Sequence, residues 1–242
     1  MRKNYSLSIF FPCYNEEGNV EELSRKALAV ARELTDDYEV IVVDDGSRDR
    51  TAAIAGALAE EDPHLRLVRH ETNRGYGAAL TTGFRAAAKD LVFYTDGDGQ
   101  FDLGELPKLL PLIENADMVC GYRLRRRDPL PRKVNAWLWG ALVNHLFHLR
   151  VRDVDCAFKL FRRKIFDRMI LTSRGALIDT EILARAALSG YIFVQTGVNH
   201  YPRVSGSQTG AKPGVILRAF KELFALKTEL EQERKRVVLS YK

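Results

Sequence analysis

The sequence predicts an α/β protein built on a doubly wound, largely parallel sheet. Apolar runs of strand length alternate with helical patterns over residues 1–121, as in chains that form such sheets. Two of these runs end in pairs of acids, Asp44-Asp45 and Asp96-Gly97-Asp98. Right-handed crossovers bring the carboxyl ends of parallel strands to one edge, where open α/β sheets bind ligands. The sequence therefore places four carboxylates together at a candidate site.

Local patterns predict each element of the first half. A buried strand at 7–11 comes first, and apolar residues at helical spacing then predict a helix over 18–34. Ser47 and Asp49 are candidate N-caps of the second helix, which is expected to end near Glu61. The remaining expected elements are strands at 38–43, 65–69, 91–95 and 117–121, and helices at 75–89 and 103–114.

The regular alternation breaks after Gly121, so the second half is predicted less simply. The expected elements are an amphipathic helix at 132–149, a strand at 158–161, a helix at 178–189, a strand at 191–199, a mobile Gly- and Ser-rich loop at 205–214 and a final amphipathic helix at 215–236. No internal repeat and no clear linker to a second domain is visible.

Composition excludes several classes of protein. Cys13, Cys120 and Cys156 are odd in number and scattered, which fits neither a disulfide framework nor a zinc site, and we expect reduced thiols in a cytoplasmic protein. No run reaches the ~20 apolar residues of a membrane span, and no signal peptide is expected.

The net charge of +5 is unevenly distributed along the chain. A short stretch carries Arg123, Arg125, Arg126, Arg127, Arg132 and Lys133. Such a stretch is either a solvated loop or a site for phosphate groups, nucleic acid or anionic lipid. Because no RNA-binding motif or recognition helix accompanies it, we expect no nucleic-acid partner.

Two further motifs follow strands of the predicted sheet. Pro12-Cys13-Tyr14-Asn15-Glu16 comes after the first strand, where Glu16 could also be an ordinary acid at a helix N-terminus. Asn73-Arg74-Gly75-Tyr76-Gly77 opens the helix after the third strand, and free N–H groups there can meet phosphate. This glycine pattern is not the dinucleotide fingerprint, which needs three glycines directly after the first strand.

Taken together, these motifs resemble the family 2 glycosyltransferases with the GT-A fold, especially the polyprenyl-phosphate sugar transferases of the dolichol-phosphate mannosyltransferase type. The likeness covers residues 5 to about 165, more weakly to about 210. It also includes Gly121-Tyr122-Arg123 and Asp155-Cys156-Ala157-Phe158-Lys159. The resemblance implies a UDP- or GDP-sugar donor, an Mg²⁺ or Mn²⁺ cofactor and inverting transfer.

The resemblance also implies a role for individual residues on the donor side. Asp45 would hold the base or ribose, and Arg203 would belong to a loop that closes over the diphosphate. Asp96, Asp98 and Gln100 would hold the metal and the diphosphate, since hard oxygen ligands suit Mg²⁺ or Mn²⁺. The remaining residues expected at the nucleotide are Pro12, Tyr14, Asn15, Glu16, Asp44 and Gly75.

On the acceptor side, Arg123 and Arg132 match basic positions that the family uses near an acceptor phosphate. An acceptor phosphate is already anionic and needs no strong base, whereas a hydroxyl acceptor does. Asp179 and Glu181 are candidate bases, although both could be ordinary acids at a helix N-terminus. Cys156-Ala157 replaces the small residue and Gly of many relatives, and Gly97 replaces a common Ala.

The resemblance divides the chain into a catalytic domain at 1–212 and an amphipathic helix at 213–242. Within the domain, 1–122 would be the nucleotide-sugar half and 123–212 the acceptor half. The final helix and the helix carrying Trp137 and Trp139 could contact a membrane surface, pack in the core or form a dimer. We expect a cytoplasmic protein, peripheral at the membrane if its acceptor is a lipid.

Three alternatives remain at this stage. The donor chemistry could serve a hydroxyl acceptor such as a glycan, a glycolipid or a metabolite. The chain could be a non-catalytic module that binds nucleotide sugars, although all four acids of the strand ends are present. A nucleotidyltransferase shares this type of sheet, but it would need a Gly-rich basic loop where residues 12–16 lie.

Overall fold

The computed structural model describes the backbone of residues 5–124, 130–203 and 213–240 and the side chains of 5–124, 133–203 and 219–235. The strands are β1 (Leu7–Cys13), β2 (Tyr38–Asp44), β3 (Leu65–Arg69), β4 (Leu91–Thr95), β5 (Met118–Leu124), β6 (Phe158–Arg162) and β7 (Phe193–Asn199). The helices are α1 (Val20–Leu34), α2 (Thr51–Glu61), α3 (Tyr76–Ala86), α4 (Leu110–Ile113), α5 (Leu130–Phe147), α6 (Ile178–Leu188) and α7 (Pro213–Ser240), with 3₁₀ turns η1 (Leu103–Lys108) and η2 (Arg163–Asp167).

All seven strands form one sheet in the order β3-β2-β1-β4-β6-β5-β7. The predicted α/β class is confirmed, and the sheet is largely parallel. Strand β6 differs, because it pairs antiparallel with β4 on one side and with β5 on the other. The strand order reverses between β1 and β4, which creates the switch point where such sheets bind ligands.

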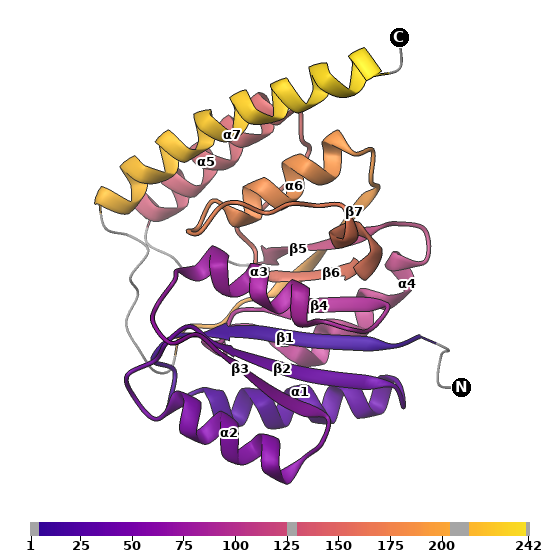
Figure 1. The fold of residues 1–242 in the computed structure, drawn as a ribbon, viewed down its shortest axis with the longest axis vertical. Helices are drawn as coiled ribbons and strands as arrows, with labels where there is room; N and C mark the ends of the chain where they lie inside the picture. The colour runs from indigo at the N-terminus through magenta and orange to yellow at the C-terminus, as the bar shows by residue number, and fades with distance from the viewer. Residues whose placement is uncertain (1–4, 125–129, 204–212, 241–242) are drawn as a thin grey trace.

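Helices cover both faces of the sheet. Helices α1 and α2 pack against β2 and β3 on one face, and α3 packs on β1 and β2 from the other (Figure 1). Helices α5 and α7 both pack outside α6 (Figure 1), and Trp139 of α5 meets Phe220 of α7 edge to face. Strands β1, β2 and β4 are buried along their whole length, which explains why their sequences are continuous apolar runs.

Two predicted helices differ from those observed. The helix expected at 103–114 is instead η1 followed by the single turn α4, because Pro107 and Pro111 each lack the N–H that a regular helix needs. The helix expected at 75–89 ends at Ala86. The loop expected at 205–214 lies almost wholly outside the described residues.

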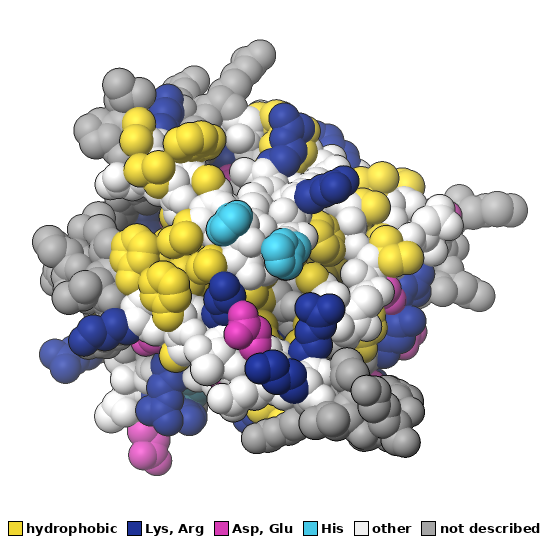
Figure 2. Space-filling view, turned by 90° about the horizontal axis from the view of Figure 1, so that it is seen from above, with side chains coloured by type: hydrophobic (Ala, Val, Ile, Leu, Met, Phe, Trp, Pro, Cys, Tyr) yellow, Lys and Arg dark blue, Asp and Glu magenta, His cyan; other side chains and the backbone are white. Residues whose placement is uncertain are grey.

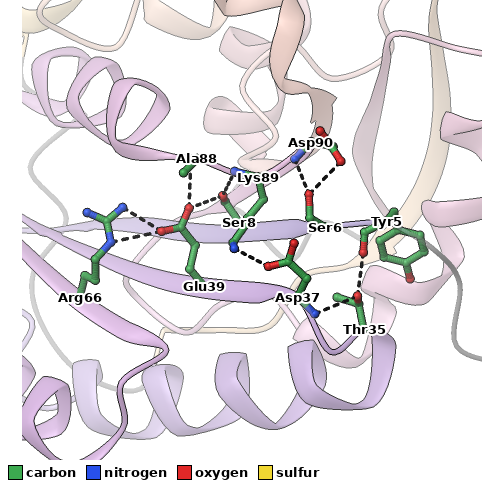
Figure 3. A network of polar contacts seen from close by, with 10 residues as sticks. All are labelled: Tyr5, Ser6, Ser8, Thr35, Asp37, Glu39, Arg66, Ala88, Lys89 and Asp90. Atoms are coloured by element: carbon green, nitrogen blue, oxygen red, sulfur yellow. Dashed lines mark hydrogen bonds and ion pairs between the residues drawn. The ribbon is translucent and has the colours of Figure 1, made fainter.

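A polar network at the amino ends of the central strands fixes the turn between α3 and β4 (Figure 3). Glu39 of β2 is buried and accepts hydrogen bonds from Ser8 Oγ at 2.7 Å, Ala88 N at 2.7 Å and Arg66 Nη2 at 2.8 Å. Burial acts to raise the pKa of Glu39, but these donors outweigh it and lower the pKa. The network holds the start of β4 beside β1 and so helps to place the acids that follow β4.

Helix α7 is attached to the body of the protein by leucines and by ion pairs. Leu223, Leu226 and Leu230 are buried, so this apolar face belongs to the core. Arg185 of α6 donates to Glu229 at 2.6 Å and to Glu233 at 3.0 Å. The three cysteines are buried free thiols, as predicted.

We predict that Gly83→Ala destabilises the fold by about 1–3 kcal/mol, because α3 approaches β1 too closely for a methyl group. A Cβ at Gly83 would lie 2.2 Å from the Phe10 ring. The matched control is Gly140→Ala on α5, where a Cβ meets nothing within 4 Å. It should be neutral or stabilising by up to about 1 kcal/mol. Urea unfolding of both variants tests this, and equal stability of the two would contradict it.

Candidate active site

The site lies at the carboxyl edge of the sheet, where the segments after β1, β2 and β4 meet. Parallel pairing places Cys13 beside Asp44, and β1 pairs with β4 up to Tyr94. A Cβ at Gly97 would lie 2.4 Å from the Pro12 carbonyl oxygen, so the residue between Asp96 and Asp98 must be small. This close approach brings the acids after β4 against the loop after β1.

One guanidinium joins two of the acids from these loops. Arg203 donates from Nη2 to Asp98 Oδ2 at 2.8 Å and from Nη1 to Glu16 Oε1 at 3.2 Å. Glu16 also accepts from Asn19 Nδ2 at 2.6 Å. Burial raises the pKa of Glu16, while Asn19 and Arg203 act to lower it. The structure therefore brings together three of the predicted donor-site residues.

Asp96 lies between several other negative charges. It accepts from Tyr76 OH at 2.8 Å. Burial, followed by the charges of Asp98 and Asp179, raises its pKa to about 7, although Tyr76 and Arg123 act in the opposite direction. A buried carboxylate that feels the charge of a second one favours either a proton or a cation.

The segment that carries Arg203 runs alongside the acid motif of β4. Gln100 Nε2 donates to Tyr201 O, and Tyr201 N donates to Gln100 O, each at 2.8 Å. Phe101 and His200 form a β-bridge. These contacts hold the segment before Arg203 against Gln100.

The loop after β1 is shaped by contacts with the loop after β2. Asn15 has φ 58°, and its backbone N–H donates to Ser47 Oγ at 2.9 Å. The predicted N-caps of the second helix are wrong, because Arg50 is the N-cap of α2 and makes no side-chain capping bond. Asp49 lies one residue before it, and its Oδ1 accepts from Thr51 N at 2.9 Å. Tyr14 in this loop is 38% exposed, and its contact with a nucleotide base stays a prediction.

The two acids at the end of β2, Asp44 and Asp45, make contacts within the protein. Asp45 accepts from Arg74 N and Gly75 N, each at 2.9 Å, and lies 2.6 Å from His70 Nδ1. Gly75 has φ 99°, and a Cβ there would lie 2.5 Å from the Arg174 carbonyl. Asp44 is fully buried, with Oδ2 3.3 Å from Arg69 Nε. Asp45 thus positions the glycine loop, and its contact with a nucleotide stays a prediction.

The geometry does not support Glu181 as a catalytic base. Its carboxylate is fully buried and accepts from Thr172 N, Ser173 N and Arg185 Nε. These bonds lower its pKa, although burial acts to raise it. The loop that it holds reaches α3, where Gly77 N donates to Arg174 O at 2.9 Å. Glu181 is therefore a structural acid.

Asp179 is also unsuited to act as a base, because a buried lysine neutralises it. Lys159 Nζ donates to Asp179 Oδ1 at 2.6 Å, and Tyr94 OH donates to the same oxygen. Burial acts to lower the pKa of Lys159, but the charge of Asp179 outweighs it and the pKa is raised. Lys159 also donates to the carbonyls of Val154 and Cys156. A fully buried lysine held this way fixes the loop around Asp155.

Asp155 is a functional candidate that the sequence reasoning did not select. Its side chain is exposed, while the protein atoms crowded around the carboxylate and then the charges of Asp179 and Asp153 raise its pKa to about 6. Shifted pKa values of this kind cluster at functional sites. The signal was present, because Asp155 belongs to one of the motifs that carry the family resemblance.

Arg123, which the resemblance assigns to the acceptor side, is held firmly by one carboxylate. Its Nε and Nη2 donate to the two oxygens of Asp153, each at 2.7 Å. The pKa of Arg123 is raised, because the bonds to Asp153 outweigh burial, which acts to lower it. Residues 125–127 lie outside the described residues, as does the side chain of Arg132, so their roles at an acceptor phosphate stay predictions.

The residues present fit a hard divalent cation chemically. Asp96, Asp98 and Gln100 supply carboxylate and amide oxygens, and burial and then the charge of Asp98 raise the pKa of Asp96. Within the described part of the chain, no three His, Cys, Asp or Glu side chains are arranged as a metal site. Gln100 is an amide and does not count toward such a cluster, and the carboxylate of Asp98 is already paired with Arg203.

The chain belongs to Glycosyl transferase family 2, which its residues 8–170 match. A relative from Photorhabdus laumondii, named undecaprenyl-phosphate 4-deoxy-4-formamido-L-arabinose transferase, is 34% identical over 167 residues, 68% of this chain and 51% of the relative. A protein of the same name from Pseudomonas fluorescens is 35% identical over 175 residues, 71% of this chain and 52% of the relative. The chain spans about half the length of these curated relatives.

Solved structures confirm the GT-A type of fold. Glucosyl-3-phosphoglycerate synthase from Mycobacterium tuberculosis, crystallised with Mn²⁺, UDP and phosphoglyceric acid, superposes with a TM-score of 0.70. The match covers 93% of this chain and 79% of that one at 20% identity, so it supports the fold alone. The same enzyme with UDP-glucose in place of UDP gives a TM-score of 0.69 and 18% identity, covering 93% of this chain and 80% of that one.

We predict that Asp96→Asn stabilises the protein at pH 8 by on the order of 1–2 kcal/mol. The pKa of Asp96 is about 7 in the folded protein against 3.8 for a free side chain, so the wild type loses stability as the pH rises from about 4 to 7. The amide can still accept from Tyr76. Thermal unfolding at pH 4 and pH 8 tests this, with Glu60→Gln on the exposed face of α2 as the control. A lower melting temperature for Asp96→Asn at pH 8 would contradict the prediction.

Proposed function

We propose that the protein transfers a sugar, with inversion, from a nucleotide-diphosphate sugar to a polyprenyl phosphate. Membership of the glycosyltransferase family sets the class of reaction. The observation that supports this function most directly is the approach of Asp98 and Glu16 to one cationic group at the switch point of the sheet. A nucleotide diphosphate with a divalent cation satisfies the same charges.

In this proposal, Asp96, Asp98 and Gln100 hold Mg²⁺ or Mn²⁺. The cation supplies neutralisation of the leaving diphosphate. The loop at 12–16 and the glycine loop held by Asp45 line the nucleotide, while Arg203 donates to the diphosphate. The solved relatives with Mn²⁺ and UDP support a diphosphate and a cation in this type of fold, and the base and sugar of this chain's donor stay open.

The acceptor proposal rests on the names of the relatives and on the acceptor side of the site. The curated relatives are named as transferases that act on undecaprenyl phosphate. A phosphate oxygen is an anionic nucleophile, so it attacks the anomeric carbon without a strong base while the bond to the diphosphate breaks. This fits a site in which Asp179 is neutralised and Glu181 is buried.

A lipid acceptor requires the protein to work at a membrane surface. In the described parts of the chain, no helix is both long and apolar enough to cross a bilayer. Trp137 of α5 is 70% exposed, Leu138 is 53% exposed and Phe224 of α7 is 53% exposed. Figure 2 shows apolar side chains and Lys or Arg side chains together at the end of the molecule where α5 and α7 lie. We propose that this end contacts the membrane interface.

The donor site is tested by thermal shift with UDP, GDP, CDP and TDP, each with Mn²⁺ or with chelator. We expect one diphosphate at about 100 times its Kd to raise the melting temperature by about 5–10 °C, only with Mn²⁺. Asp98→Ala should abolish the shift. Asp167→Ala, an exposed acid of η2 remote in sequence from the site, should keep it. Shifts that survive both chelation and Asp98→Ala would rule out this donor site, as would no shift at all.

One observation favours a second candidate, transfer to a hydroxyl group. Asp155 carries the raised pKa, about 6, that suits a general base near neutral pH. It is exposed, and Lys159 fixes the backbone on both sides of it. A glycan, glycolipid or metabolite hydroxyl would need such a base, whereas a phosphate would not.

The two acceptors are separated by comparing polyprenyl phosphate with the matching polyprenol, using the donor that the binding panel selects. For the proposed phosphate acceptor, we expect transfer to the phosphate alone, and Asp155→Asn should retain it to within about tenfold. A hydroxyl acceptor would instead make the same variant lose about 10²–10⁴ in rate. Circular dichroism of Asp155→Asn provides the control for folding.

A further inference from the structure

We propose that Arg203 is an exchangeable counterion that makes binding of the divalent cation conditional on the nucleotide diphosphate. Its guanidinium donates to Asp98 Oδ2 at 2.8 Å and to Glu16 Oε1 at 3.2 Å. Asp98 is also a proposed metal ligand, so the guanidinium and the cation compete for one carboxylate. This inference rests on the proposed donor site and concerns its regulation.

The competition is strong because the three side chains are poorly solvated. Their exposed fractions are 20% for Arg203, 11% for Glu16 and 10% for Asp98. Charge-assisted hydrogen bonds are stronger in such surroundings than on an open surface. A cation that arrives alone must displace the guanidinium and then lie beside an unpaired positive charge.

The segment before Arg203 couples this exchange to the rest of the metal motif. Gln100, the proposed amide ligand, exchanges hydrogen bonds with Tyr201 through both its side chain and its backbone. The bridge between Phe101 and His200 continues this pairing. Movement of Arg203 therefore disturbs two of the three proposed ligands together.

The Nε atom of Arg203 is the observation that indicates an anionic ligand. This nitrogen is buried and has no hydrogen-bond partner among the described residues. A buried donor without a partner is unfavourable, and an oxygen of a diphosphate would satisfy it. The guanidinium would thus bind the diphosphate in place of Asp98, and the carboxylate of Asp98 would be free to bind the cation. Cation and diphosphate then bind cooperatively, each raising the affinity for the other by the same factor.

The test is a Mn²⁺ titration that follows the electron paramagnetic resonance signal of free Mn²⁺, without nucleotide and with the diphosphate that the panel selects. Without nucleotide, Arg203→Gln should bind Mn²⁺ about three- to tenfold more tightly than wild type. With the diphosphate, it should bind Mn²⁺ more weakly than wild type, because the diphosphate loses its guanidinium. Arg203→Lys keeps the positive charge but cannot donate to two groups at once. Its affinity for Mn²⁺ should lie between those of wild type and Arg203→Gln in both titrations.

The matched control is Arg25→Gln, because Arg25 also bridges two carboxylates, Glu21 and Glu61, but on the exposed side of α1. It should match wild type in both titrations. If Arg25→Gln gained as much Mn²⁺ affinity as Arg203→Gln, the gain would come from net charge alone, and the proposed role of Arg203 would be wrong. Unchanged or weaker Mn²⁺ binding by Arg203→Gln without nucleotide would overturn it too. If no variant binds Mn²⁺ even with a diphosphate, the proposed function itself fails.

Discussion

Repulsion between carboxylates at one edge of the sheet is the constraint on which the site depends. Asp96, Asp98 and Glu16 come from two strand ends that a buried sheet forces together, and Gly97 lets them approach further. The protein meets this repulsion with a raised pKa at Asp96 and a guanidinium between the other two. Positive charge at such a site stabilises the ionised carboxylates. This is a physical reason to propose a ligand that brings a metal cation with its diphosphate.

A second ionic group, Lys159 with Asp179, is fully inside the protein and has a structural role. Lys159 is fully buried, and its ammonium donates hydrogen bonds to one carboxylate, one phenol and two carbonyls. Removing either partner of such a pair leaves an uncompensated buried charge, which is far more costly than the pair is stabilising. The loop that bears Asp155 is therefore held by the core and not by its own turn chemistry.

Much of the donor half could be predicted from sequence, because its strands are buried on both faces and its acids follow them directly. The antiparallel insertion of β6 could not, since strand pairing is a non-local choice. The roles of Glu181 and Asp179 also depended on contacts with Thr172, Ser173 and Lys159, which sequence spacing does not reveal. The interrupted helix at 103–114 is different, because Pro107 and Pro111 are visible in the sequence and argue against a regular helix there.

The position of β6 has a mechanical consequence. This strand comes from the second half of the chain, yet it is hydrogen-bonded along β4, which carries the acids of the first half. Among the described residues, the two halves predicted at 1–122 and 123–212 thus share one continuous sheet. Opening one half from the other would break a central ladder of backbone hydrogen bonds. Within the described residues, the acids that follow β4 are therefore supported by strands from both halves of the chain.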